Sequence, residues 1–221
     1  MIVNRAFFSA IFLVLIAFNG CQIRHEPRGS MNEASLPARS IQQPLPENAS
    51  PQLKQLLASA IEQTSITTGY DPAYVSIAYP GGDVPPETGV CSDVLVRAFR
   101  KTGIDLQKEV HEDMKVAFGE YPRKWGLAKP DTNIDHRRVL NLATFFERKG
   151  KALPVTMERK DYLPGDLVAW DLGGGIPHIG IVSSLATEAD KHFLIIHNIG
   201  AGARAEDVLF NWKITGHYRY F

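Results

Sequence analysis

Apolar residues in the first half of the chain recur with the spacing of amphipathic helices. The first helix is expected after Ser50, a favoured N-cap residue, with apolar positions at 53, 56, 57, 60 and 61. A second begins around Val90 and ends before Gly103. Two more are expected over 107–118 and 136–149, with Asp135 as a cap of the last, and a short strand over 74–79.

Beyond Gly150 the pattern changes to short apolar runs that are typical of strands. These runs cover 167–170, 178–183, 193–197 and 214–220, and glycine-rich turns occupy 173–175 and 200–202. Helices followed by a series of strands predict an α+β domain whose helices pack on an antiparallel sheet.

An apolar run near the start of the chain is too short to cross a membrane. Residues 6–18 contain one polar residue, Ser9, and follow the basic Arg5, whereas a membrane-spanning helix needs about 20 apolar residues. The run ends at residues 18–21, Phe-Asn-Gly-Cys, which resemble a bacterial lipobox, where a signal peptidase cuts before a cysteine that then carries lipid. Cys21 is therefore the expected lipid anchor; an ordinary cleaved signal peptide is the alternative.

We accordingly expect three parts and export to the periplasm or cell envelope. Residues 1–20 are the lipoprotein signal peptide, 21–49 a lipid-anchored flexible tether rich in proline and polar residues, and 50–221 the folded domain. We expect a monomer that is held at a membrane through its lipid.

Charge and cysteine content narrow the function further. Lys plus Arg and Asp plus Glu each number 24, so the net charge is zero and nothing points to a nucleic-acid partner. The chain has two cysteines, and if Cys21 carries lipid, Cys91 is a single free thiol in an oxidising compartment. It is a functional thiol, a small buried apolar residue, or half of a disulfide with Cys21 in an uncleaved precursor.

The position of Cys91 favours a catalytic role. It falls in the first turn of the second predicted helix, behind Thr88 as a candidate N-cap, where free N–H groups and the helix dipole stabilise a thiolate. His178, at the start of a predicted strand, is the candidate base. His197, at the end of the next strand, is the candidate residue that orients His178, with Asn198 as the alternative.

Four segments, in this order, resemble the NlpC/P60 superfamily of papain-like cell-wall cysteine peptidases. They are the nucleophile helix at 91–96, the Leu-Pro-Gly-Asp-Leu-Val segment at 163–168, the His-Ile-Gly-Ile-Val strand at 178–182 and the Ile-Ile-His segment at 195–197. Within it, the chain resembles domain-of-unknown-function family 1287. The resemblance implies a papain-like fold that hydrolyses an amide bond in peptidoglycan stem peptides. It implies Cys91 as nucleophile, His178 as base and His197 as orienting residue, without cofactor or metal.

The segment 109–160 departs from that superfamily, whose members usually cross from the cysteine helix to the sheet in fewer residues. It contains Asn133, Asp135, His136 and Arg137, which we expect either to line the cleft and hold substrate carboxylates or to form a helix cap and a solvated basic face.

Three other functions remain open at the level of sequence. His178, His197 and Asp166 could bind zinc, although the chain lacks a His-Glu-x-x-His motif and a metal leaves Cys91 unexplained. A thioester-forming acyltransferase or amidase would use the same cysteine on another substrate. A murein-binding lipoprotein without catalysis could retain the same fold.

Overall fold

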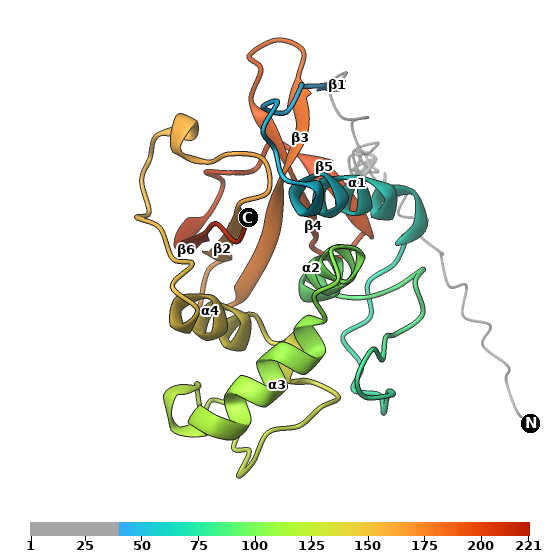
Figure 1. Cartoon of the computed structure of the whole chain (residues 1–221), viewed down its shortest axis with the longest axis vertical. Helices are drawn as coiled ribbons and strands as arrows, with labels where there is room; N and C mark the ends of the chain where they lie inside the picture. Colours follow the sequence, from blue (N-terminus) through green and yellow to red (C-terminus); the bar gives the residue numbers. More distant parts are fainter. Residues whose placement is uncertain (1–39) are drawn as a thin grey trace, which may run out of the picture. The chain divides into compact units, whose positions relative to one another are not determined.

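The computed structural model describes residues 40–221, and Figure 1 shows their arrangement. The predicted signal peptide, the lipid-anchor cysteine Cys21 and most of the predicted tether lie outside this range. Among the described residues, no helix combines the length and the apolar character needed to cross a bilayer.

A six-stranded antiparallel sheet forms one layer of the domain. Five strands follow the order β5-β4-β3-β2-β6, and β1 pairs with the C-terminal end of the long strand β3. The strands are β1 (Ser40–Gln42), β2 (Leu167–Asp171), β3 (Pro177–Thr187), β4 (Phe193–Asn198), β5 (Ala203–Glu206) and β6 (Lys213–Tyr218).

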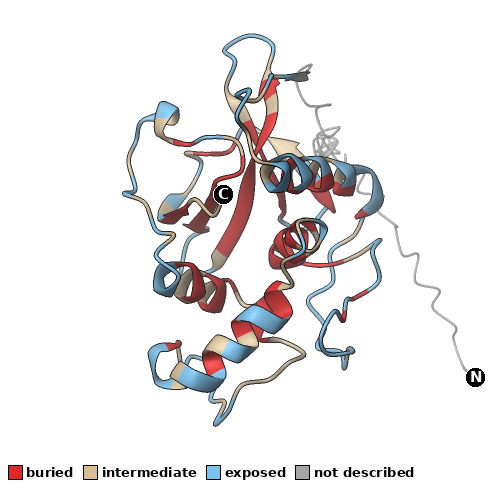
Figure 2. Ribbon diagram, in the orientation of Figure 1, coloured by how far each residue is buried: buried red, intermediate tan, exposed pale blue. Residues whose placement is uncertain are grey.

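Helices cover one face of this sheet. Helix α2 packs on β3 and β4 and against α1, whereas α4 packs on β3 and β6. Figure 2 shows the buried faces of α1 and α2 turned toward the strands. The helices are α1 (Pro51–Ile66), α2 (Cys91–Lys101), α3 (Leu106–Ala117) and α4 (Val139–Arg148), with short 3₁₀ helices η1 (Phe118–Glu120), η2 (Asp135–Arg137) and η3 (Arg159–Asp161).

Both faces of the sheet are buried, which explains why its strands are apolar in continuous runs. Along β2, Leu167 and Ala169 belong to the cluster beneath the helices, whereas Val168 and Trp170 belong to a second cluster on the opposite face. Successive strand residues point to opposite faces, so a run of four apolar residues needs a cover on each side.

The predicted α+β class, with the cysteine helix packed on an antiparallel sheet, is confirmed. The strand predicted over 74–79 is wrong, because residues 67–90 form no helix or strand. Side chains replace a partner strand there: Asn133 Oδ1 accepts from the Ile77 N–H at 3.0 Å, and Gln107 Nε2 donates to the Ala78 carbonyl at 2.9 Å.

Two predicted boundaries also change. The folded unit includes β1 and does not start at residue 50, because Gln42 Nε2 donates to Ser184 Oγ at 2.7 Å and β1 is paired along β3. The helix predicted over 136–149 is split into η2 and α4, and Arg138, not Asp135, is the N-cap residue of α4.

Candidate active site

Cys91 is the first residue of α2 and lies where this helix meets strand β3. The backbone N–H groups of Ile179, Ser92 and Cys91 lie near its sulfur and favour the thiolate, so they act to lower the pKa of the thiol. Ile179 directly follows His178, so the thiol lies beside the strand position that carries the predicted base. Thr88 is not the N-cap: that position is Val90, whose N–H donates to Asp93 Oδ2 at 2.7 Å.

The two predicted catalytic histidines are in contact. His178 on β3 and His197 on the neighbouring strand β4 are 3% and 1% exposed, and His178 Nε2 lies 2.8 Å from His197 Nδ1. The other ring nitrogen of His197, Nε2, lies 2.9 Å from Glu206 Oε2 on β5. Three adjacent strands therefore carry a continuous chain of hydrogen bonds from His178 to a carboxylate whose side chain is 41% exposed.

The carboxylate at the end of this chain fixes which nitrogens carry protons. An ionised carboxylate only accepts, so His197 donates from Nε2 and accepts at Nδ1, and His178 must then donate from Nε2. The lone pair of His178 is left on Nδ1, the nitrogen that remains for a thiol. The hydrogen bond from His197 is the main cause that lowers the pKa of Glu206. This lowered pKa keeps the carboxylate ionised at neutral pH.

Gly180 allows the two histidine strands to approach. A Cβ at this position would lie 2.7 Å from Ile195 Cγ2 and 3.1 Å from His197 Cβ. The indole ring of Trp212 lies 6.0 Å from the His178 ring and 6.2 Å from the His197 ring, measured between centroids. The pair is therefore packed in a site with little water.

Burial dominates the electrostatics of the thiol and its neighbour. It raises the pKa of the Cys91 thiol to about 11, although the three backbone N–H groups act in the opposite direction. Burial and the nearby His197 lower the pKa of His178 to about 3. The lowered thiol pKa expected from the helix N-terminus is therefore wrong for the free protein, because burial outweighs the N–H groups and both groups are neutral at rest.

Cys91 lines a groove of about 220 Å³. Its wall comes partly from the segment after α3, which contributes Trp125 and Arg138, and partly from Tyr70, Val90 and Pro177. Neither Trp125 nor Arg138 was predicted as a site residue.

The four residues predicted to bind substrate carboxylates mostly serve the structure. Asp135 and His136 are 1% and 2% exposed, and burial lowers the pKa of His136 to about 4. The Asn133 amide joins its own loop to 74–77. Of the four, only Arg137 lines the groove, but its guanidinium is bonded to Asp93 at 2.9 and 3.0 Å.

The predicted zinc ligands do not come together. Both Asp166 oxygens are occupied by basic residues: His217 Nε2 lies 2.8 Å from Oδ2, and Arg219 bonds to both oxygens. Across residues 40–221 there is no cluster of three acidic, histidine or cysteine side chains with metal-binding geometry. Glu206, in contrast, joins the histidines; sequence patterns missed it because β5 has four residues and no apolar run.

Comparison with solved structures gives distant likenesses. A lipoprotein-like protein of the NLP/P60 family from Staphylococcus aureus is 13% identical, with a TM-score of 0.37 over 80% of this chain and 43% of that one, so this chain spans less than half of that protein. An N-acetylmuramoyl-L-alanine amidase from Bacteroides uniformis is also 13% identical, with a TM-score of 0.41 over 76% of this chain and 98% of that one. At these values neither likeness carries a conclusion about activity.

Sequence comparison gives a much stronger relationship. The protein YijF of Escherichia coli (strain K12), described as an uncharacterized protein, is 58% identical over 162 residues, which is 73% of this chain and 78% of the relative. The model of the family described as "Domain of unknown function (DUF1287)" matches residues 57–220. The chain therefore belongs to the DUF1287 family, which is the family that its motifs predicted.

Proposed function

We propose that this protein is a cysteine hydrolase that cleaves an amide bond in peptidoglycan stem peptides. Cys91 is the nucleophile, His178 the base and His197 the residue that orients it. The observation that carries this proposal is the meeting of α2 and β3, where Cys91 lies near the backbone N–H of Ile179, the residue after His178, while His178 is hydrogen-bonded through His197 to Glu206.

The resting pair is uncharged, so the proton must move during attack. Burial opposes a lone thiolate and a lone imidazolium alike, but a thiolate–imidazolium pair is neutral as a unit. As the sulfur attacks the substrate carbonyl, its proton passes to His178 Nδ1 and a C–S bond forms. Backbone N–H groups at the start of α2 are suited to bind the developing oxyanion.

The second half of the reaction returns both residues to their resting state. The C–N bond of the tetrahedral intermediate breaks, and the imidazolium of His178 gives its proton to the departing amine. His178 then takes a proton from water as the water oxygen attacks the thioester. The acid product leaves, and the sulfur receives its proton back.

Glu206 is a positioning residue in this scheme. It holds the proton of His197 on Nε2 through the 2.9 Å contact, so His197 presents an acceptor to His178. Its negative charge also stabilises the imidazolium that forms during attack, through the chain of two hydrogen bonds.

The proposal is tested by digestion of purified peptidoglycan, with the released fragments identified by mass spectrometry. The parent protein should release peptide fragments, whereas Cys91→Ala and His178→Ala should release none at a temperature at which circular dichroism shows both variants folded. Digestion by Cys91→Ala at the parent rate would overturn the mechanism. Binding of peptidoglycan without release by the parent would favour a murein-binding lipoprotein, and products joined to an added amine would favour an acyltransferase.

Export and lipid anchoring are a separate part of the proposal, supported by the apolar run at 6–18 and the lipobox-like residues that end at Cys21. Mass spectrometry of the protein isolated from membranes should find a lipid-modified N-terminal cysteine. Cys21→Ala should abolish the modification, and an unmodified parent in the soluble envelope fraction would refute the anchor.

A further inference from the structure

The groove beside Cys91 contains one charge that is not neutralised by an ion pair. The charged side chains that line it are those of Arg137 and Arg138. Arg137 is paired with Asp93, and its remaining N–H groups donate to the carbonyls of Ala73 and Asp71. The remaining walls are apolar or aromatic, so the free positive charge in the groove comes from Arg138.

Arg138 is held in place by an aromatic ring. Its Cζ lies 4.3 Å from the centroid of the Trp125 ring, and within residues 40–221 the guanidinium has no carboxylate oxygen within 4.0 Å. Asp131 and Asp135 lie near enough to act on its charge, and one oxygen of each accepts a backbone N–H, from Asn133 and Asp131 respectively. Stacking therefore fixes the plane of the guanidinium and leaves its N–H donors for a ligand.

We propose that Arg138, stacked on Trp125, is a subsite for a carboxylate that the substrate carries close to its scissile amide. This inference rests on the proposed function and names the chemical class of substrate that the groove selects. The planar fork of N–H donors matches both oxygens of a carboxylate. Apolar side chains of the groove, such as Ile134 and Pro177, lower the local polarity and strengthen the pairing.

The subsite predicts discrimination between an acid and its amide. A carboxamide has the shape of a carboxylate but no charge, and one of its two polar atoms is a donor that faces other donors. Loss of a charge-assisted hydrogen bond corresponds to roughly a 10- to 100-fold loss in the rate constant kcat/KM.

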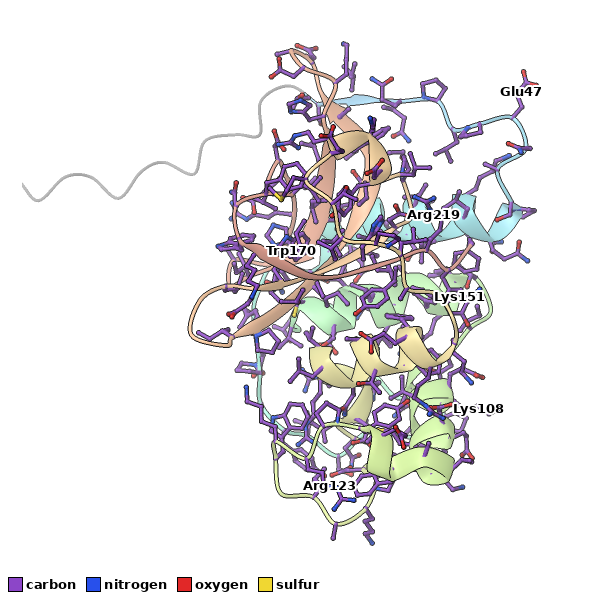
Figure 3. The ribbon with its side chains drawn as sticks, turned by 90° about the vertical axis from the view of Figure 1, so that its left-hand side faces the viewer. Glu47, Lys108, Arg123, Lys151, Trp170 and Arg219 are labelled. Carbon is purple, nitrogen blue, oxygen red and sulfur yellow. The ribbon has the colours of Figure 1, made fainter. Side chains whose placement is uncertain are left out.

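The experiment uses the purified protein and a series of synthetic murein tripeptides. Each peptide has one carboxylate replaced by a carboxamide, and kcat/KM is measured for each peptide and for the parent tripeptide. The variants are Arg138→Met, which keeps an apolar stem, and Arg138→Lys, which keeps the charge without the fork. Arg123→Met is the matched control: Arg123 is an exposed arginine on the same loop, toward the end of the molecule away from the sheet (Figure 3).

One carboxamide peptide should be cleaved 10- to 100-fold more slowly than the parent tripeptide by the unmodified protein. Arg138→Met should bring that ratio close to one by slowing cleavage of the acid alone, Arg138→Lys should give an intermediate ratio, and Arg123→Met should leave it unchanged. An unchanged acid-to-amide ratio in folded Arg138→Met would overturn the subsite and leave the proposed hydrolase intact.

A binding measurement separates the two proposals if no peptide is cleaved. In Cys91→Ala, calorimetric titration with the parent tripeptide should give a Kd that Arg138→Met weakens about tenfold or more. Equal affinity in both proteins overturns the subsite. Binding that depends on Arg138 in a parent protein without hydrolysis supports the subsite and refutes the hydrolase.

Discussion

Arg137 lines the groove but is also bonded to Asp93, so it could bind substrate or stabilise the fold. The substitution Arg137→Met distinguishes these two roles. Its side chain is 2% exposed and that of its partner Asp93 is 3% exposed. Two N–H groups bond to the carboxylate at 2.9 and 3.0 Å, and two contacts to backbone carbonyls bring in the loop at 71–73. Methionine retains the apolar stem and removes every one of these contacts.

The cost follows from what the substitution leaves behind. A buried carboxylate without its partner costs about 3–5 kcal/mol. In a domain of this size each kcal/mol lowers Tm by about 2–4 °C, so Arg137→Met should unfold roughly 6–20 °C below the parent. Asp93→Asn combined with Arg137→Met should cost less than the sum of the single changes, because no unpaired charge remains.

Thermal and urea unfolding followed by circular dichroism measure these changes, and peptidoglycan digestion measures activity below the transition. The matched comparison is Arg138→Met, which removes a guanidinium one residue along the chain and should shift Tm by no more than about 2 °C. If Arg137→Met kept the parent Tm and raised KM, Arg137 would be a substrate ligand and its assignment to the fold would be wrong.

Three further changes probe other parts of the structure. Glu206→Gln should lower kcat about fivefold to tenfold with little change in KM or Tm, because it removes the charge but keeps an acceptor near His197. A pH–rate profile and a Tm measurement check this, and an unchanged kcat would refute the positioning role of Glu206. Gly180→Ala should destabilise the domain by about 1–3 kcal/mol in urea because its methyl group meets Ile195, and an unchanged midpoint would contradict the close approach of β3 and β4. Burial alone would raise the pKa of Asp166, but hydrogen bonds from His217, Arg219 and a backbone N–H outweigh burial and lower this pKa. Its contribution to stability is therefore present above about pH 4 and is lost as the pH falls through the lower pKa of the folded state. Asp166→Asn should flatten that part of the curve of unfolding free energy against pH.

Residues in long apolar runs were predictable from the sequence. The start of α2 and the positions of His178 and His197 follow from patterns within about ten residues each, and the order of the motifs placed them in one domain. Their contact is consistent with neighbouring antiparallel strands, which β3 and β4 are.

Residues whose role depends on distant partners were not predictable. Arg137 and Arg138 are adjacent, and only Asp93, 44 positions away, decides that the first is buried in an ion pair and the second faces the groove. The pattern over 74–79 is typical of a strand, but the backbone of this segment is hydrogen-bonded by side chains from other segments and not by a neighbouring strand. The pKa of Cys91 was predicted from its helix, whereas the atoms that bury it come from elsewhere.

The neutral resting state of Cys91 has a consequence for the survival of its thiol in the oxidising cell envelope that we propose as its location. The thiolate is the form that attacks peroxides and disulfides, and at pH 7 a thiol with a pKa of about 11 is ionised in roughly one molecule in ten thousand. With only 6% of the residue exposed, oxidants also have little access to the sulfur. Burial thus protects the thiol from oxidation without a disulfide partner, and in the proposed reaction the anion forms only when a bound peptide is present to consume it.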